Sequence, residues 1–197
     1  MPLSDPAPRE PLHTRQVECR GFLRDDWLWD IEGHMTDRKT YAFLNDEHGE
    51  IAAGAPIHDM WVRVTIDDDM VIKAIEAVTD ASPYRMCPNV TPNFQRLVGL
   101  SIRPGFIPRV KQLLGGVEGC THLVELMGPL ATTAFQTVFS ARGREKRERE
   151  RQARGEPPAS TENLRPPLLA TCHTFAVDSP VVQRIWPAFY KGKTQEA

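Results

Sequence analysis

The chain has 197 residues, and its 24 lysines and arginines nearly balance its 26 aspartates and glutamates, leaving a formal net charge of -2. A chain of this length can bury a core without disulfide bonds. The balanced charge gives no overall attraction to nucleic acid or to an anionic membrane, so we expect neither as a partner. Its apolar runs are far shorter than the about 20 residues of a membrane span. No transmembrane helix is expected.

The cysteines and the N-terminus indicate the cellular compartment. The four cysteines contain no CxxC pair, and the first residues lack the basic and apolar blocks of a signal peptide. We therefore expect reduced thiols and a cytoplasmic location.

The first half of the chain has the pattern of β-strands. Residues 1–14 contain four prolines and no periodicity, which predicts a disordered arm. Two pairs of runs then follow, joined at Asp25–Asp26 and at 67–69. We expect strands at about 16–25, 27–38, 59–66 and 70–78, forming two β-hairpins. In the third run apolar residues occupy every second position, so one face of the sheet is predicted to be buried.

The second half has the 3.6-residue period of helices, which we expect to cover that face. Short helices are predicted at about 92–98 and 106–114. A long helix is predicted to begin at Thr121 as its N-cap, and to continue beyond Arg142 as a charged extension. A proline-rich loop follows at 155–167, and then the apolar segment 168–185, which could be a strand or a helix.

These elements predict an α+β fold, in which an antiparallel sheet of hairpins packs against a long C-terminal helix and shorter helices. We expect one domain over 15–190. It includes the charged extension and proline-rich loop at about 142–167, and a short tail, 191–197, follows it.

His58 and Asp59 are the first candidates for catalysis. They stand together at the start of a predicted strand, and either could act as a general base. Adjacent strand residues point to opposite faces, so only one of them can face a given pocket unless the strand is bulged. The structural alternative is that Asp59 caps a turn and His58 is an edge residue.

Glycine-rich residues 115–119 precede a second candidate group, Cys120, Thr121 and His122. A helix that begins here exposes free backbone N–H groups, which form a ready site for an anion such as a phenoxide. The structural alternative is a glycine turn with a threonine cap and two buried side chains.

Two further sets of residues have alternative roles. Trp27 and Trp29 share one face of a predicted strand and could stack on an aromatic ligand, although packing against the sheet explains them equally. Cys87, Cys120 and His122 could hold zinc or iron, but their spacing matches no compact ligand motif. We therefore expect no metal and no cofactor, with this set as the alternative.

Six segments carry a resemblance to a known family. They read CRGFLRDD (19–26), WDIEGH (29–34), GAPIHDM (54–60), PYRMCP (83–88), GCTHL (119–123) and FQT (135–137). The chain resembles a widespread bacterial family of domains of unknown function over about residues 15–190. The family usually has an Asp-Gly turn where this chain has Asp25–Asp26. An activity associated with small proteins of this kind is that of phenylcoumaran γ-formaldehyde lyase, an aromatic-catabolism enzyme that degrades β-5-linked lignin dimers.

This resemblance suggests a cofactor-independent lyase that acts on a small aromatic substrate derived from lignin. From the chemistry, Asp59 or His58 would be the base and His122 the acid, with Cys120 and Thr121 beside the developing phenoxide. Four residues would bind the rings: Trp27, Trp29, Tyr84 and Arg85. The alternative is a zinc- or iron-binding module without catalysis, or with hydrolytic activity.

The arrangement of the predicted elements leads to two structural expectations. His58, Asp59 and His122 should converge on one pocket, since the long helix should place its N-terminus near the strand ends of the sheet it covers. The protein should be a homodimer, because the long helix has more apolar surface than a small sheet can cover.

Overall fold

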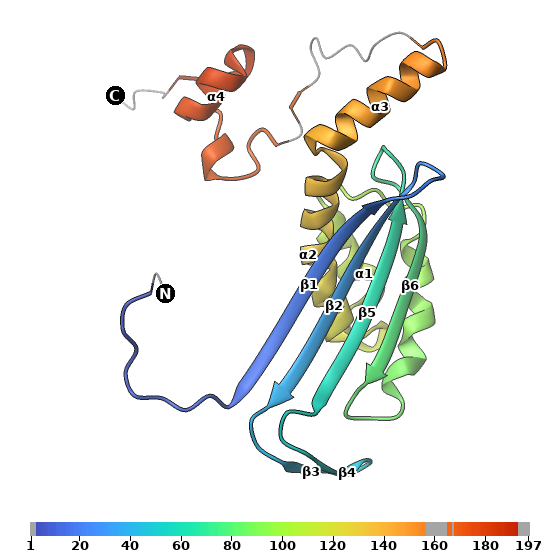
Figure 1. Ribbon diagram of the computed structural model, residues 1–197, viewed down its shortest axis with the longest axis vertical. Coiled ribbons are helices and arrows are strands. Elements are labelled where there is room, and N and C mark those ends of the chain that lie inside the picture. The colour runs from blue at the N-terminus through green and yellow to red at the C-terminus, as the bar shows by residue number, and fades with distance from the viewer. Residues whose placement is uncertain (1–2, 157–164, 167, 193–197) are drawn as a thin grey trace. The chain divides into compact units, whose positions relative to one another are not determined.

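A four-stranded antiparallel sheet is the centre of the fold in the computed structural model, which describes residues 3–156, 165–166 and 168–192 (Figure 1). Its strands lie in the order β1-β2-β5-β6. They are β1 (His13–Leu23), β2 (Trp29–Lys39), β5 (Pro56–Ile66) and β6 (Ile72–Ala81). The two expected hairpins are β1–β2 and β5–β6. A small hairpin that was not expected, β3 (Phe43–Asn45) and β4 (Gly49–Ile51), connects β2 to β5.

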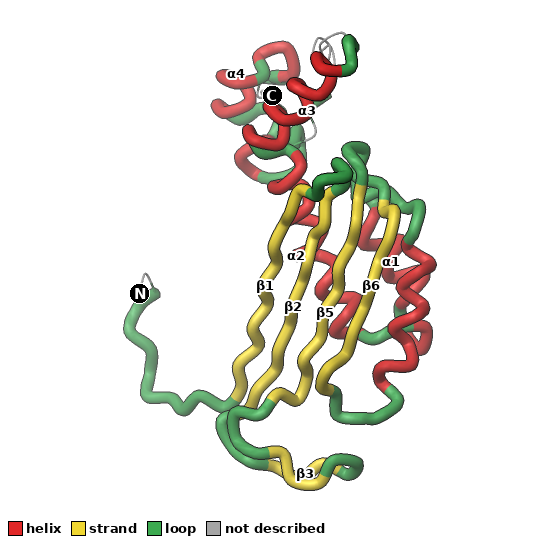
Figure 2. Tube along the Cα trace, turned by 45° about the vertical axis from the view of Figure 1, so that its right-hand side comes forward, coloured by secondary structure: helices red, strands yellow, loops and turns green. Residues whose placement is uncertain are grey.

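Helical segments cover one face of this sheet, as Figure 2 shows. They are the 3-10 segments η1 (Cys87–Leu97) and η2 (Gly116–Glu118) and the helices α1 (Phe106–Leu114) and α2 (Thr121–Val138). The bounds of α1 confirm the sequence prediction. Helix α2 begins at the predicted residue, although Cys120 and not Thr121 is its N-cap, but it ends at Val138 and does not continue beyond Arg142. The helix predicted at 92–98 overlaps η1, which ends at Leu97 and contains Pro92, a residue without a backbone donor.

The core lies between the sheet and these helices. Alternate residues of β2 and β5 point into it, among them the fully buried Ile31 and Val64. Gly21 and Gly33 let α2 approach closely, since a Cβ atom at Gly21 would collide with Thr137. Arg15, near the start of β1, contacts Glu125 in the second turn of α2. Helix α2 therefore runs in the same direction as β1, and its N-terminus lies at the end of the sheet where β1 begins.

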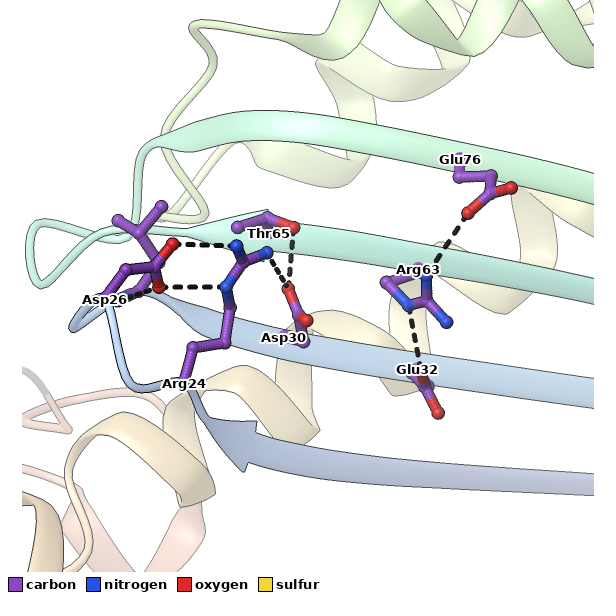
Figure 3. A network of polar contacts seen from close by, with 8 residues as sticks. Arg24, Asp26, Asp30, Glu32, Arg63, Thr65 and Glu76 are labelled. Atoms are coloured by element: carbon purple, nitrogen blue, oxygen red, sulfur yellow. Dashed lines mark hydrogen bonds and ion pairs between the residues drawn. The ribbon is translucent and has the colours of Figure 1, made fainter.

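The other face of the sheet carries polar side chains that pair across the strands (Figure 3). Arg63 on β5 contacts Glu32 on β2 at 2.8 Å and Glu76 on β6 at 3.3 Å. Thr65 donates its hydroxyl to Asp30 at 2.6 Å. We call this side the open face. The combination of one helix-covered face and one polar face confirms the expected α+β class.

The contacts divide the chain into two compact units, Met1–Arg147 and Glu148–Ala197. The boundary falls within the expected charged extension, inside a separate helix, α3 (Ala141–Ala153), that follows the end of α2 at Val138. The described part of the second unit is helical, with η3 (His173–Phe175), α4 (Pro180–Ile185) and η4 (Pro187–Phe189). Most of the expected proline-rich loop and of the tail lies outside the described residues. Among those described, no helix combines the length and apolarity needed to cross a bilayer.

Candidate active site around Asp37

A row of polar residues crosses three strands at the end of the sheet where α2 begins. Arg15 on β1 lies opposite Asp37 on β2, and Asp37 lies opposite His58 on β5. Directly opposed residues of antiparallel strands share a face. All three side chains therefore lie on the helix-covered face, below the N-terminus of α2.

Asp37 is the centre of this row. Arg15 binds it through two parallel hydrogen bonds, Nε to Oδ1 at 2.8 Å and an Nη atom to Oδ2 at 2.9 Å. His13 Nε2 lies 3.0 Å from Oδ1, and His58 Nδ1 lies 3.0 Å from Oδ2. Only 2% of the Asp37 side chain is exposed. We call Asp37 with His13, Arg15, His58 and His122 the Asp37 cluster.

These contacts fix the ionisation of Asp37. Burial by itself would raise the pKa of the carboxyl group. The hydrogen bonds from Arg15, His13 and His58 outweigh that effect, so the pKa lies well below its ordinary value. An ionised carboxylate only accepts hydrogen bonds, so both histidine nitrogens that face Asp37 carry a proton.

His58 and His122 lie against each other. Their ring centroids are 3.9 Å apart and the rings are tilted by 36°. Burial, and the nearby His122, lower the pKa of His58 despite its bond to Asp37. Burial, and the positive charge of Arg15, likewise lower the pKa of His122. Both imidazoles are therefore neutral near pH 7. Because Nδ1 of His58 donates to Asp37, its Nε2 is the nitrogen that can accept a proton.

The N-terminus of α2 completes the site. Cys120 is its N-cap, and Cys120 Sγ lies 3.8 Å from His122 Nδ1. No side chain caps this end, so the backbone N–H groups of the first turn, which have no partner within the helix, are available to an anion. Thr121, expected to be the cap, is instead the exposed first residue of the helix.

Asp59 does not belong to this site, so the expected convergence is correct for His58 and His122 and wrong for Asp59. It follows His58 on β5 and points to the open face, where its Oδ1 lies 2.7 Å from His34 Nε2. His34 in turn stacks on Trp61 with ring centroids 3.7 Å apart. The alternation of side chains along a strand, which already made a shared pocket doubtful, explains the separation.

The two tryptophans proposed to bind substrate lie at the other end of the sheet. Trp29 is 3% exposed and donates its Nε1–H to Asp68 at 2.9 Å. It precedes Asp37 by eight residues, which is about 27 Å along a strand. Trp27 lies in the β1–β2 turn next to Trp29. Neither tryptophan can therefore reach a substrate at the Asp37 cluster of the same chain.

Tyr84 and Arg85 lie at the end of the sheet that carries the cluster. They follow Ala81, the last residue of β6, which pairs with Asp59 next to His58. The backbone N–H of Arg85 donates to Glu47 in the β3–β4 turn at 2.6 Å. This hydrogen bond joins the segment that follows β6 to the β3–β4 turn. Tyr84 is about half exposed and available to a ligand.

The metal-ligand set that the structure gathers differs from the one proposed from the sequence. Among the described residues, the ligand atoms of Asp37, His58 and His122 all lie within 4.8 Å of one another. Cys87 is not part of that group. Cys120 precedes α2 as its N-cap and contacts His122.

The sequence interpretation missed His13, Arg15, Asp37 and Glu125. The opposite charges of Arg15 and Asp37 on two predicted strands were a usable signal, because opposed strand residues of opposite charge favour pairing. Using it requires the register of the hairpin, which was not known.

One comparison with known proteins gave a match. Residues 13–136 match the model of a family described as "Protein of unknown function (DUF2889)". This segment contains every residue of the Asp37 cluster and most of α2. No curated protein and no solved structure matches the chain.

Proposed function

We propose that this chain, which belongs to the DUF2889 family, is a cofactor-independent lyase that works by acid–base catalysis. The description of the family gives no reaction, so the geometry of the site supports the proposal. The observation that carries the proposal is the contact between His58 and His122, with His58 held by Asp37. Asp37 orients one imidazole and leaves its Nε2 ready to accept a proton, as carboxylates do for catalytic histidines. His122 lies close enough to pass on or deliver a proton.

The proposed substrate is the one suggested by the resemblance, a phenolic phenylcoumaran dimer derived from lignin. His58 takes the proton of the γ-hydroxyl group, and the bond between Cγ and Cβ breaks to release formaldehyde. The electron pair of that bond forms the Cα–Cβ double bond of a stilbene, while the Cα–O aryl ether bond breaks. His122 gives a proton to the phenoxide and recovers one from His58. The reaction is redox-neutral and consumes no external proton.

The surroundings of the cluster suit these charges. A phenoxide would be stabilised by the N–H groups at the N-terminus of α2, beside Cys120 and Thr121. Tyr84 and Arg85 are the proposed contacts for the aromatic rings. Trp27 and Trp29 of the same chain have no part in this proposal.

The direct test is incubation of the purified protein with a phenylcoumaran dimer. We expect the stilbene and formaldehyde to appear in equal amounts, measured by mass spectrometry and by a formaldehyde-trapping reagent. A folded protein that releases neither product rules out this substrate. A mass-spectrometric screen of other aromatic dimers would then follow.

The second candidate function is a metal site, favoured by the close approach of Asp37, His58 and His122. Two features oppose it. Both oxygens of Asp37 already accept two hydrogen bonds each, and Arg15 neutralises the carboxylate. The rings of His58 and His122, tilted by 36° with centroids 3.9 Å apart, contact each other through their faces, whereas two imidazoles that bind one ion point in-plane lone pairs at it from about 2.1 Å.

Elemental analysis separates the two candidates. We expect the protein to contain far less than one equivalent of zinc or iron, and its activity to survive dialysis against a chelator. Near-stoichiometric metal that is lost in the His122→Gln variant would favour the metal site.

Two further proposals concern the location and the assembly state. We propose a cytoplasmic protein, since its four cysteines are unpaired. The apolar residues of α2, from which we expected a homodimer, are buried within the chain itself and give that expectation little support.

A further inference from the structure

The two edges of the sheet differ in how their outer backbone groups are used. At the β6 edge, Ile72 N–H donates to Leu100 and Ile72 accepts from Gly99, while the side chain of Gln95 donates to the carbonyl of Ile75. At the β1 edge, no backbone hydrogen bond joins residues 13–23 to any described segment other than β2. Within the described part of the chain, the outer backbone groups of β1 are therefore a row of unused donors and acceptors.

Strand β1 also lacks several of the features that protect an edge from pairing. It pairs with β2 over eleven residues without a register shift, and its sequence contains neither proline nor lysine. The pairing of β5 with β6, in contrast, is shifted at two points. A net charge of -2 does little to keep two copies apart.

The charges of β1 favour a second copy as the occupant. Glu18 and Arg20 point to the open face, where they contact each other at 2.7 Å, and their side chains are 58% and 63% exposed. The arginines of the other open-face pairs contact acids on neighbouring strands or in the adjacent turn (Figure 3). Glu18 and Arg20 have no partner on another described strand.

We propose that two copies of this chain pair through antiparallel β1 strands, with Cys19 opposite Cys19 at a two-fold axis. In this register Glu18 of each copy lies opposite Arg20 of the other. A shift of the axis to position 18 would oppose two glutamates, and a shift to position 20 would oppose two arginines. The result is a continuous eight-stranded sheet, and each added backbone pair uses groups that are otherwise unpaired.

The two-fold symmetry also places the β1–β2 turn of one copy beside the Asp37 cluster of the other. Arg15 of one copy lies opposite Leu23 of the other, the last residue before the β1–β2 turn. The turn that carries Trp27 in one copy therefore borders the cluster of its partner. This consequence rests on the proposed function, whereas the pairing itself does not.

Light scattering tests the pairing without reference to activity. At micromolar concentration we expect a mass of about 44 kDa, twice the 22.2 kDa of the chain. Glu18→Arg or Arg20→Glu alone opposes like charges at both copies of the pair, so either should raise the dissociation constant about tenfold or more. The double variant exchanges the charges and should restore the dimer.

Glu76→Arg is the matched control, since it makes the same charge change on the open face at the opposite edge. It should leave the dimer intact. A wild-type mass of 22 kDa overturns the proposal. The proposal is also overturned if neither single substitution raises the dissociation constant of the dimer, or if the double variant stays dissociated.

Discussion

His58→Gln and His122→Gln are each expected to lower kcat/KM for a phenylcoumaran dimer by about 100-fold or more while the fold survives. The glutamine amide at position 58 can still donate a hydrogen bond to Asp37, but it cannot take up a proton. The two imidazoles act on one proton path. The double variant should therefore lose little more activity than either single variant.

The pH dependence of the wild-type protein follows from the same pair. The pKa of each histidine is lowered from its ordinary value of 6.5, firstly by burial. The proposed base is the neutral imidazole, so activity should be constant above that value and fall once the pH drops below the lowered pKa values. The two rings are coupled, so the fall reports the pair and not one residue.

Asp59→Asn is the control for these variants. It removes a carboxylate next to His58 in the sequence but on the other face of the sheet, so kcat/KM should stay within a few-fold of the wild-type value. The kcat/KM values of the variants and the wild type are compared from rates of stilbene formation. If Asp59→Asn lost 100-fold and His58→Gln lost nothing, the Asp37 cluster would not be the active site.

The sequence predicted the strands and α1 well because their signals are local. The period-2 pattern of 60–66 and the 3.6-residue period of 106–114 reflect which side chains a single element buries. The β3–β4 hairpin was missed because its strands have only three residues each, too few for a period. The end of α2 at Val138 was missed because only two residues separate it from the helix-forming residues of α3.

The candidate site was only half predictable, for a geometric reason. His58 and His122 were found because each belongs to a conspicuous local segment, a strand start and a helix N-terminus. Asp37 is recognisable only from its partners, and those depend on the register of β1 and β2. That register is set by a turn at 24–28, with Trp27 in the left-handed region (φ 68°), not by a two-residue turn at Asp25–Asp26. The longer turn brings Arg15 opposite Asp37.

Asp37→Asn is expected to destabilise the protein by about 3 kcal/mol at pH 7. Removing one member of a buried ion pair costs about 3–5 kcal/mol, and the lower figure applies because 39% of the Arg15 side chain is exposed. An asparagine amide would also direct its own N–H groups at Arg15 or at the two histidines, which are donors themselves. For a chain of this size the midpoint of thermal unfolding should fall by about 6–12 °C.

The stability difference between wild type and Asp37→Asn should itself depend on pH. The pKa of Asp37 is lower in the folded protein than its ordinary value of 3.8, so the unfolded chain takes up the proton first as the pH falls. The difference in free energy of unfolding between wild type and Asp37→Asn is fully present above pH 3.8, and it is lost as the pH falls below that value. His58 and His122 titrate in a separate window, because the pKa of each is lowered from 6.5.

Denaturant unfolding at pH 7 and at several values below pH 4 tests both expectations, with Asp59→Asn measured alongside. Asp59 is more exposed and has one histidine partner instead of an arginine and two histidines, so its replacement should cost less than about 1 kcal/mol. Equal costs for the two substitutions would contradict the central role of Asp37. A difference that persisted unchanged in strong acid would show that the lost stability does not come from the charge of its carboxylate.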